Sequence, residues 1–488
     1  MLPLERKGTP ARVDLSSPDF DFQHFFVRKL VAREGVSELY RCTLHLALPT
    51  SANADVTVAS AIGAAVRIEL VDQGGTPVGV LHGIVDGASI TGGEESHGLE
   101  AWEITVAPRA ARLALVTTQE IFMQKSVPAI IAAKLEEAGL GSSFAMRLSG
   151  TYPEREFVVQ YRETDLDFIC RLAEHVGISF SFEQGEDEEI MVFTDDTKAL
   201  APELSERVVY SPRRDVLGVF ELTRQARIIP TVYAVQDYNY RNPNLDVGAI
   251  VESALGSGGG VVEYGAHQKD PDEGRWLAKV RAEEAEGRAC SYAGVSVVGG
   301  LSAGVHFALE SAPPWADASL FVVRVEHELS TPLGGDASEA ARYVNRFTAI
   351  SSNTRFRPAR STPRPRIHGV VSAVVQGSGG SSYEANLDPQ GRYLVQFHFD
   401  TAEPGLPQPS RPVRMSQPFA GPNQGMHFPL RPGTEVLVVF IDGDPDRPII
   451  VGAVPNTVTP SVVTAVESQR HRIQSHHGLL VQFGKSLA

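Results

Sequence analysis

Cysteine is scarce in this sequence. The 488 residues contain three, Cys42, Cys170 and Cys290, and more than a hundred residues separate each from the next. An odd number at this spacing does not favour a disulfide framework, and it excludes the paired CxxC arrangement of a zinc ribbon. We therefore predict three buried, reduced thiols.

Long apolar segments and the motifs of common hydrolases are also missing. No run of about 18 apolar residues occurs, as a membrane-spanning helix would need. The opening MLPLERKGTPARVD lacks the apolar stretch of a secretory signal, so we expect export by a route other than the general one. Without HExxH or GxSxG, metalloprotease and α/β-hydrolase chemistry lack their minimal arrangements. We predict no catalytic residue, no cofactor and no enzyme activity.

Positive charge is in deficit over most of the chain. Forty-four basic and 59 acidic side chains give a formal charge of −15, the opposite of the footprint of a nucleic-acid-binding protein. Residues 355–488 carry 13 basic and 9 acidic residues. Residues 1–354 carry the other 31 basic and 50 acidic residues. The acidity therefore belongs to the first two thirds. The apolar fraction of 42% is ordinary for soluble globular proteins, and the length predicts about three folded units.

The first part of the chain alternates apolar and polar residues in short runs. Residues 40–48 (YRCTLHLAL) and 65–72 (AVRIELVD) have the period of half-buried strands. Glycine-rich segments at 74–79 and 91–98 supply hairpin turns between such runs. These features predict a β-rich meander or barrel.

Three helices interrupt the strands. Ser126 can cap the first, which carries Pro128 in its first turn and ends at Gly139. The second runs from about Thr164 to Val176, with an apolar stripe at helical spacing. The third is predicted from Asp270 to about Glu286, with Asp270 as its cap.

A proline- and arginine-rich segment, residues 354–369, separates the helix-containing part from a second β-rich part. After it, residues 392–400 (RYLVQFHFD) send Tyr393, Val395, Phe397 and Phe399 to one face. Residues 434–442 (TEVLVVFID) are apolar on both faces, as in a central strand. About ninety residues with five such runs fit a small closed barrel of the oligosaccharide/oligonucleotide-binding (OB) type.

Several of these segments carry a family resemblance. Residues 152–182 (YPEREFVVQYRETDLDFICRLAEHVGISFSF) resemble a strand–helix–strand segment of the VgrG spike proteins of type VI secretion. Four further segments resemble barrel segments of the same family, in the same order: TPRPRIHGVVSAVVQG (362–377), GRYLVQFHFD (391–400), RPVRMSQPFAG (411–421) and PGTEVLVVFIDGDPDRPIIVGAVPN (432–456). The resemblance extends over nearly the whole chain.

The resemblance implies a mainly β protein with a few helices. Residues 1–361 would form a base similar to a phage tail hub, 362–456 an OB-fold neck, and 457–488 the start of a triple-stranded β-helix needle. It implies a homotrimer that docks on the hexameric Hcp tube and binds a PAAR-repeat tip protein. Effectors, which it carries, and baseplate proteins would be its further partners. Such a protein would assemble in the cytoplasm and leave through the injection apparatus. Spikes of phages and of extracellular contractile systems share this plan and remain an alternative.

Two departures from the family pattern stand out. Gln424-Gly425 occupies a place where many relatives have an aromatic residue before glycine. Residues 468–484 (SQRHRIQSHHGLLVQFG) resemble only the first strands of a needle, which indicates a short form or a truncated chain. A rival in which the spike bears an enzyme domain needs further chain after the barrel, and 32 residues follow Asn456.

Candidate ligand sites compete with plainer interpretations. The terminal GKS at 484–486 lacks the glycine spacing of a phosphate loop. The acidic run Glu183 to Glu189 lacks the alternating ligands of a calcium loop, and a solvated hairpin tip is favoured. His471, His476 and His477 are candidate metal ligands, because threefold symmetry would turn one histidine into three ligands. Ordinary turn histidines are the favoured interpretation.

The arginines of the proline-rich segment raise the possibility of nucleic-acid binding beside an OB barrel. These residues are Arg355, Arg357, Arg360, Arg364 and Arg366. Phe356 is the one aromatic residue among them that could stack on a base, and the rest of the chain is acidic. We therefore predict no nucleic-acid partner and expect these arginines to bind a neighbouring acidic subunit.

Overall fold

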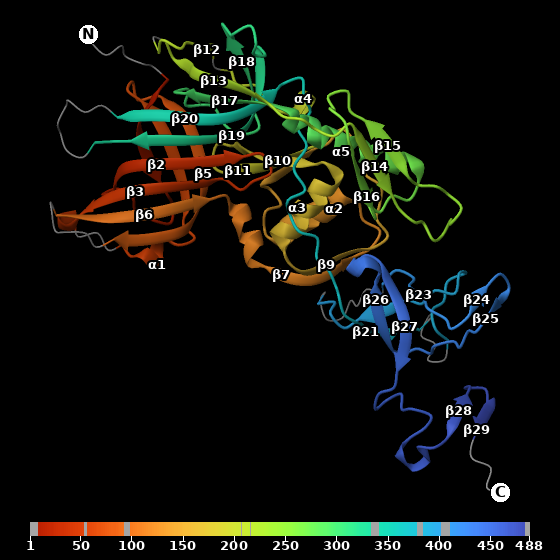
Figure 1. The fold of residues 1–488 in the computed structure, drawn as a ribbon. Helices are drawn as coiled ribbons and strands as arrows, with labels where there is room; N and C mark the ends of the chain where they lie inside the picture. Colours follow the sequence, from red (N-terminus) through yellow and green to blue (C-terminus); the bar gives the residue numbers. More distant parts are fainter. Residues whose placement is uncertain are drawn as a thin grey trace. The chain divides into compact units, whose positions relative to one another are not determined.

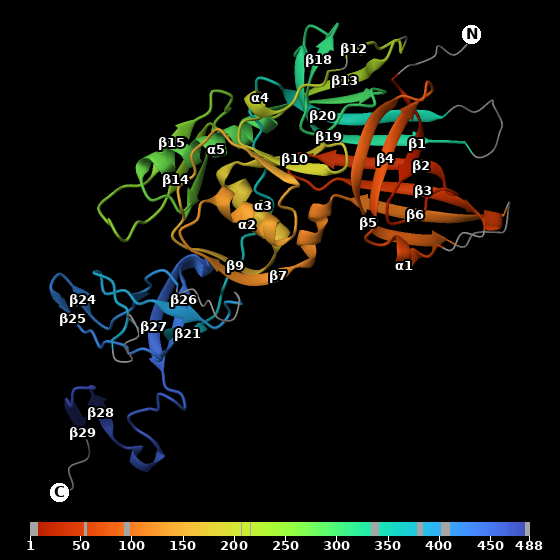
Figure 2. The same cartoon turned by 180° about the vertical axis from the view of Figure 1, so that it is seen from behind.

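The protein was analysed as a computed structural model, which describes residues 8–52, 56–91, 98–205, 207–214, 216–332, 341–377, 384–401 and 410–483. The chain divides into two compact units (Figures 1 and 2). The first unit comprises Met1–Val116, Val127–Tyr152 and Asp165–Pro363. The second comprises Thr117–Ser126, Pro153–Thr164 and Arg364–Ala488. Two short pieces of the N-terminal part therefore belong to the C-terminal unit.

The first unit is built on a twelve-stranded sheet in the order β1-β4-β5-β6-β3-β2-β19-β18-β12-β13-β17-β20. The strands are β1 Pro10–Ser16, β2 Phe26–Gly35, β3 Arg41–Pro49, β4 Ala65–Asp72, β5 Pro77–Thr91, β6 Leu99–Ala107, β12 Val208–Tyr210, β13 Gly218–Ala226, β17 Cys290–Ser296, β18 His306–Glu310, β19 Ser319–Ser330 and β20 Arg342–Ser351. β3 and β4 confirm the strands predicted at 40–48 and 65–72. The predicted turn at 91–98 falls mostly outside the described residues.

The sheet encloses two apolar cores. Because β19 also pairs with β20, the strands β19, β18, β12, β13, β17 and β20 close into a ring. Side chains such as Tyr292, Phe307 and Phe347 fill that ring. The strands from β1 to β6 share a separate core, in which Leu44, Ile68 and other alternate residues are buried. Figure 1 shows β19 running beside β2, where the two halves of the sheet join.

Two small sheets with helices complete the first unit. One contains β8 Phe144–Arg147, β10 Ser179–Gln184 and β11 Glu189–Thr194, and the other contains β14 Val232–Gln236, β15 Ala249–Glu252 and β16 Gly260–Tyr264. The longer helices are α2 Val127–Glu137, α3 Asp165–Val176 and α5 Pro271–Ala289; α2 packs on α3, and α5 on β14 and β15. Short helical turns are α1 Val58–Ala61, α4 Thr197–Leu200, and the 3-10 turns Thr50–Ala52 and Arg109–Leu115.

The three predicted helices are confirmed. Gly139 and Gly177 follow α2 and α3 with φ of 74° each, a left-handed conformation that ends a helix at little cost for glycine. The Asp270 side chain accepts hydrogen bonds from the backbone amides of Asp272 and Glu273, which caps α5. α5 continues to Ala289, a few residues beyond the predicted end.

The second unit is a small barrel-like sheet in the order β22-β21-β26-β27-β23. Its strands and the neighbouring short pairs are β7 Thr117–Phe122, β9 Val158–Thr164, β21 Val371–Val375, β22 Val395–Phe397, β23 Arg414–Met415, β24 Ala420–Gly421, β25 Gln424–Gly425, β26 Glu435–Phe440, β27 Pro448–Val454, β28 His471–Gln474 and β29 Leu480–Phe483. The 3-10 turns are Ile441–Gly443 and Ala465–Glu467.

The core of the second unit follows the predicted alternation. Tyr393, Val395 and Phe397 are fully buried, although β22 is shorter than the predicted strand and Phe399 is half-buried. β26 is central, between β21 and β27, but its residues alternate between buried and half-buried. The prediction of a central strand is therefore confirmed, with one face buried in the core and the other half-buried.

β7 and β9 contribute to the same core from far upstream. The two strands pair antiparallel, and Ile121, Phe157 and Val159 lie in the cluster that also contains Phe397. The ring centroids of Phe157 and Phe397 are 6.3 Å apart. Within the described residues, no helix is both long and apolar enough to cross a membrane.

The three cysteines form no disulfide. Cys42 is buried, as expected, whereas Cys170 and Cys290 are half-buried. Burial nevertheless raises the pKa of Cys170 to about 12, with Glu174 and Asp167 adding to the effect, so its thiol stays protonated.

Candidate functional site

The arginines of the proline-rich segment find their partners within the chain. Arg355 binds Asp196 at 2.6 Å, and Arg360 binds Glu263 at 2.7 Å. Arg357 is 7% exposed and donates to Glu283 at 2.7 Å and to the backbone carbonyl oxygen of Gly177 at 2.7 Å. The expectation that these groups bind a neighbouring acidic subunit is not supported, because acidic groups of the first unit already neutralise them.

The last two arginines of the segment lie in the second unit and bind there. Arg364 contacts Asp444 at 3.2 Å, and Arg366 donates to the carbonyl oxygen of Asp442. Each of the five arginines therefore has an acidic or carbonyl partner within its own unit. A single strand of nucleic acid binds basic groups with aromatic groups beside them, so these pairings do not favour such a partner.

Thr362 adds a polar anchor at the end of the same segment. Its amide and hydroxyl both donate to the Glu174 carboxylate, at 3.0 and 2.7 Å. Burial raises the pKa of Glu174, while the hydrogen bonds from Thr362 and Ser361 oppose that rise. Glu174 lies on the predicted helix α3, but no sequence pattern indicated that Thr362, 188 positions later, would bind it.

The acidic run from Glu183 to Glu189 forms the predicted hairpin between β10 and β11. Only Glu186 and Asp187 at its tip are fully exposed, and Glu189 is buried. The Glu189 carboxylate accepts a 2.7 Å hydrogen bond from the Arg109 amide, while Arg147 binds Glu183. The tip of the hairpin is therefore solvated as predicted, whereas Glu183 and Glu189 at its base form ion pairs with arginines of neighbouring segments.

A surface cavity of about 430 Å³ lies beside this hairpin, lined by Arg67, His82, Arg109 and residues 186–189. Arg67 binds Glu69 at 2.6 Å and Arg109 binds Glu189 at 3.2 Å, so the basic groups in the lining are paired with carboxylates. A nucleophile next to a free general base is what covalent catalysis requires. The lining also contains Ser16 and Ser17, but the two ring nitrogens of His82 contact Arg67 and Gln184 rather than either serine.

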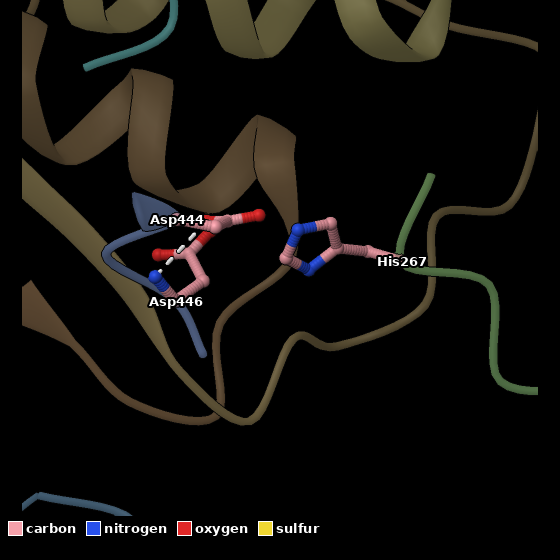
Figure 3. Close-up of side chains that lie close together, drawn as sticks. All are labelled: His267, Asp444 and Asp446. Atoms are coloured by element: carbon pink, nitrogen blue, oxygen red, sulfur yellow. Dashed lines mark hydrogen bonds between the residues drawn. The ribbon is translucent and has the colours of Figure 1, made fainter. Parts of the chain in front are cut away.

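The GDPDRP loop of the second unit binds the upstream strand β9. The Asp446 amide donates to the Asp444 carboxylate at 3.1 Å, as Figure 3 shows, and this bond shapes the loop. The Asp446 carboxylate then accepts a 2.7 Å hydrogen bond from the amide of Val159. His267, also labelled in Figure 3, belongs to the first unit, and no site is assigned to the three residues together.

The candidate metal ligands lie in the tail hairpin formed by β28 and β29. His471, His476 and His477 are all exposed, and the last two rings are 5.3 Å apart. Arg431 donates to Nδ1 of His476 at 3.0 Å, which uses one ligand atom. Among the described residues, the three do not gather into a group at ligand distance. Ordinary turn histidines stay the favoured interpretation, with a metal on a threefold axis as the untested alternative. The GKS segment at 484–486 lies outside the described residues.

The tail leaves large apolar side chains in contact with solvent. Every described residue from 451 to 483 is exposed or half-buried. Val458, Val466 and Phe483 are 85%, 93% and 62% exposed. A two-stranded hairpin without a covering layer is marginally stable in water. The apolar side chains of the tail are therefore left uncovered within a single chain.

Two family models match the chain in the order of the two units. The phage tail baseplate hub (GPD) family matches residues 33–333, and the type VI secretion system/phage-baseplate injector OB domain matches residues 383–454. Together with the paired cores of the first unit and the barrel of the second, these matches define the class: a baseplate hub joined to an injector OB domain.

The relatives narrow this class. The type VI secretion system spike protein VgrG4b of Pseudomonas aeruginosa is 31% identical over 458 residues, which cover 89% of this chain and 55% of the relative. VgrG1a of the same organism is 31% identical over 445 residues, covering 88% of this chain and 67% of the relative. The chain belongs to the VgrG family of type VI secretion spike proteins. It spans little more than half the length of VgrG4b.

One relative bears a toxin name. The actin cross-linking toxin VgrG1 of Vibrio cholerae is 29% identical over 420 residues, and the match covers 82% of this chain but 37% of the toxin. The greater part of that protein therefore lies outside the match. The family thus includes a protein named for an activity as well as proteins named as spikes.

Solved structures agree on the fold. An E. coli component of the type VI secretion system, described as similar to the T4 bacteriophage tail proteins gp27 and gp5, aligns with a TM-score of 0.65 at 23% identity, over 90% of this chain and 100% of that one. A Francisella PdpA–VgrG complex aligns with a TM-score of 0.62 at 10% identity, over 98% and 76% of the two chains. The mainly β architecture with hub and OB parts is confirmed.

Proposed function

We propose that this protein is the hub and spike of a type VI secretion system, working as a homotrimer that couples the tube to a puncturing tip. The observation that carries the proposal is the uncovered tail after a complete hub and barrel. Intertwined strands from three chains would cover the apolar side chains of the tail and leave no free strand edges. Residues 457–488 would then begin a β-helix needle.

The role is mechanical. Residues 1–361 would supply most of the base and residues 362–456 most of the neck, with β7 and β9 added to the neck from within the base. The base would dock on the Hcp tube, and the needle would meet a PAAR-repeat tip protein. Effectors would travel on the spike, which assembles in the cytoplasm and leaves through the apparatus. The paired charges in the described cavity beside Arg109 support a role without catalysis.

The test is the mass of the purified full chain, measured by light scattering over a hundredfold range of concentration. A trimer predicts a mass of about 158 kDa, three times 52.7 kDa. Pull-down of the trimer with Hcp hexamers then tests the tube contact. A monomer at every concentration, for this chain and for a version extended by a relative's needle, would refute the spike.

A further inference from the structure

A short arm of the second unit, residues 416–430, carries its apolar side chains on the outside. The strands β24 and β25 form its hairpin, and every residue from 418 to 429 is exposed. Phe419, Met426 and Phe428 are 52%, 46% and 52% exposed. The arm contains no Asp, Glu, Lys or Arg, although such residues make up 21% of the whole chain. Figure 1 shows it extending away from β26 and β27.

The arm has a fixed attachment to the barrel. The His427 ring stacks on the buried Tyr393 with centroids 6.3 Å apart, and the Leu430 amide donates to the Tyr393 hydroxyl at 3.1 Å. Gln417 and His427 bridge the two sides of the hairpin at 2.9 Å. Its base is therefore positioned by the core, while its apolar tip contacts solvent.

A second uncharged surface lies in the same unit. No charged residue occurs from Pro448 to Val466, a segment we call the valine strip. Val451, Val458, Val462 and Val466 are 44%, 85%, 47% and 93% exposed. The arm and the valine strip are both uncovered within one chain, even though fewer than twenty residues separate them in sequence.

We propose that the arm of one chain packs against the valine strip of a second copy and clasps neighbouring necks together. Interface centres are poor in charge and rich in aromatic residues and methionine, which is the composition of the arm. The strip is its uncharged counterpart, and each copy carries one of each. A head-to-tail contact between unlike surfaces closes into a ring under threefold symmetry. The inference rests on the proposed homotrimer and identifies a contact that holds it.

The decisive experiment places the photo-cross-linker p-benzoylphenylalanine at position 428 of the full chain. Light and heavy isotope-labelled proteins are mixed after unfolding, refolded together and irradiated. A protease that cuts after Asp and Glu releases residues 447–467 as a peptide separate from the arm. We expect cross-links between light and heavy chains that join the arm to this peptide. Cross-links confined to one chain, or to residues outside 447–467, would overturn the inference.

A variant pair supplies an independent measurement. Phe419→Ser with Phe428→Ser removes two exposed aromatic groups from the arm, and dissociation of the oligomer should then begin at a concentration about tenfold higher or more. Phe26→Ser is the control, because Phe26 is 59% exposed in the first unit. A wild-type monomer refutes the homotrimer and the clasp together. A wild-type trimer that dissociates at the same concentration as the double variant refutes the clasp alone.

Discussion

Glu263 pairs with two arginines, one of which, Arg360, belongs to the proline- and arginine-rich residues 354–369, here called the joining segment. Arg281, whose side chain is 4% exposed, contacts Glu263 at 2.8 Å, and Arg360 contacts the same carboxylate oxygen at 2.7 Å. Burial lowers the pKa of Arg281, and the bond to Glu263 offsets part of that effect. Burial also acts to raise the pKa of Glu263, but the arginines outweigh it and lower that pKa. Both partners therefore remain charged in the folded protein.

Glu263→Gln should destabilise the first unit by about 3 kcal/mol, because it removes the carboxylate that forms the buried ion pair with the Arg281 guanidinium. Urea unfolding followed by tryptophan fluorescence measures the change. Asp272→Asn is the control, because Asp272 lies on α5, the helix that also carries Arg281. Both side chains of its ion pair with Arg275 are exposed, so the pair should contribute less than about 1 kcal/mol. Equal losses in the two variants would mean that burial does not strengthen the pair.

The lowered pKa of Glu263 also predicts a pH dependence. A carboxyl group whose folded pKa lies below its ordinary value of 4.5 adds stability above that pH and loses it as the pH falls through the folded pKa. Wild-type stability should therefore decline below pH 4.5 more steeply than that of Glu263→Gln. Thermal unfolding between pH 3 and pH 7 provides the comparison. Parallel curves for the two proteins would contradict the lowered pKa.

Local residue chemistry was predictable, but distant partners were not. The cap at Asp270 and the glycines after α2 and α3 act within a few residues, so the sequence alone identifies them. The partners of Arg357 and Thr362 lie 74 and 188 residues away. No spacing rule reaches that far, and the arginines were therefore assigned to another subunit instead of to acidic groups of their own chain.

At the scale of elements, the second unit, which is the proposed neck, is assembled from three pieces of chain. Thr117–Ser126 and Pro153–Thr164 leave the first unit, join the second and return before the joining segment begins. Ile121 and Val159 are buried in the neck core, and the Arg411 guanidinium donates to the Asp446 carbonyl at 2.9 Å, in the loop that binds β9. The strand–helix–strand resemblance of residues 152–182 predicted a strand here, which β9 confirms, but neither resemblance nor periodicity reveals which unit a strand joins.

This connectivity predicts that cutting the joining segment leaves the two units together. A protease site inserted between the exposed residues Ala359 and Arg360 allows the cut in the folded protein. We expect two fragments on a denaturing gel and an unchanged mass in native light scattering, because β7 and β9 stay in the N-terminal fragment and remain packed in the core that the C-terminal fragment supplies.

The same cut protein with Val159→Asp is the control. Val159 is fully buried, and a charge in its place should disrupt the neck core by several kcal/mol. The C-terminal fragment should then unfold, as hydrogen exchange in residues 434–454 would show. Separation of the wild-type fragments after the cut would mean that β7 and β9 do not hold the neck.

At the scale of the whole molecule, the uneven charge has a structural use. The first 354 residues carry the acidic excess, and the arginines at the start of the basic remainder bind within it. Composition alone argued against nucleic acid as a partner but did not identify the class of protein. The class came from several motifs in a fixed order, since order along the chain constrains architecture more than any single motif does.

The proposed assembly through the second unit would make its stability depend on protein concentration. If three chains fold together, each tenfold dilution should remove about 0.9 kcal/mol of apparent stability per chain, two thirds of the usual 1.4 kcal/mol for a tenfold change. Differential scanning fluorimetry across a thousandfold range measures the shift in the unfolding midpoint. Replacing Val458 and Val466 by Asp should weaken the dependence, because a charged side chain at either position is costly to bury against a second chain. A midpoint that is independent of concentration in the wild type would show that the uncovered tail has no partner among copies of this chain.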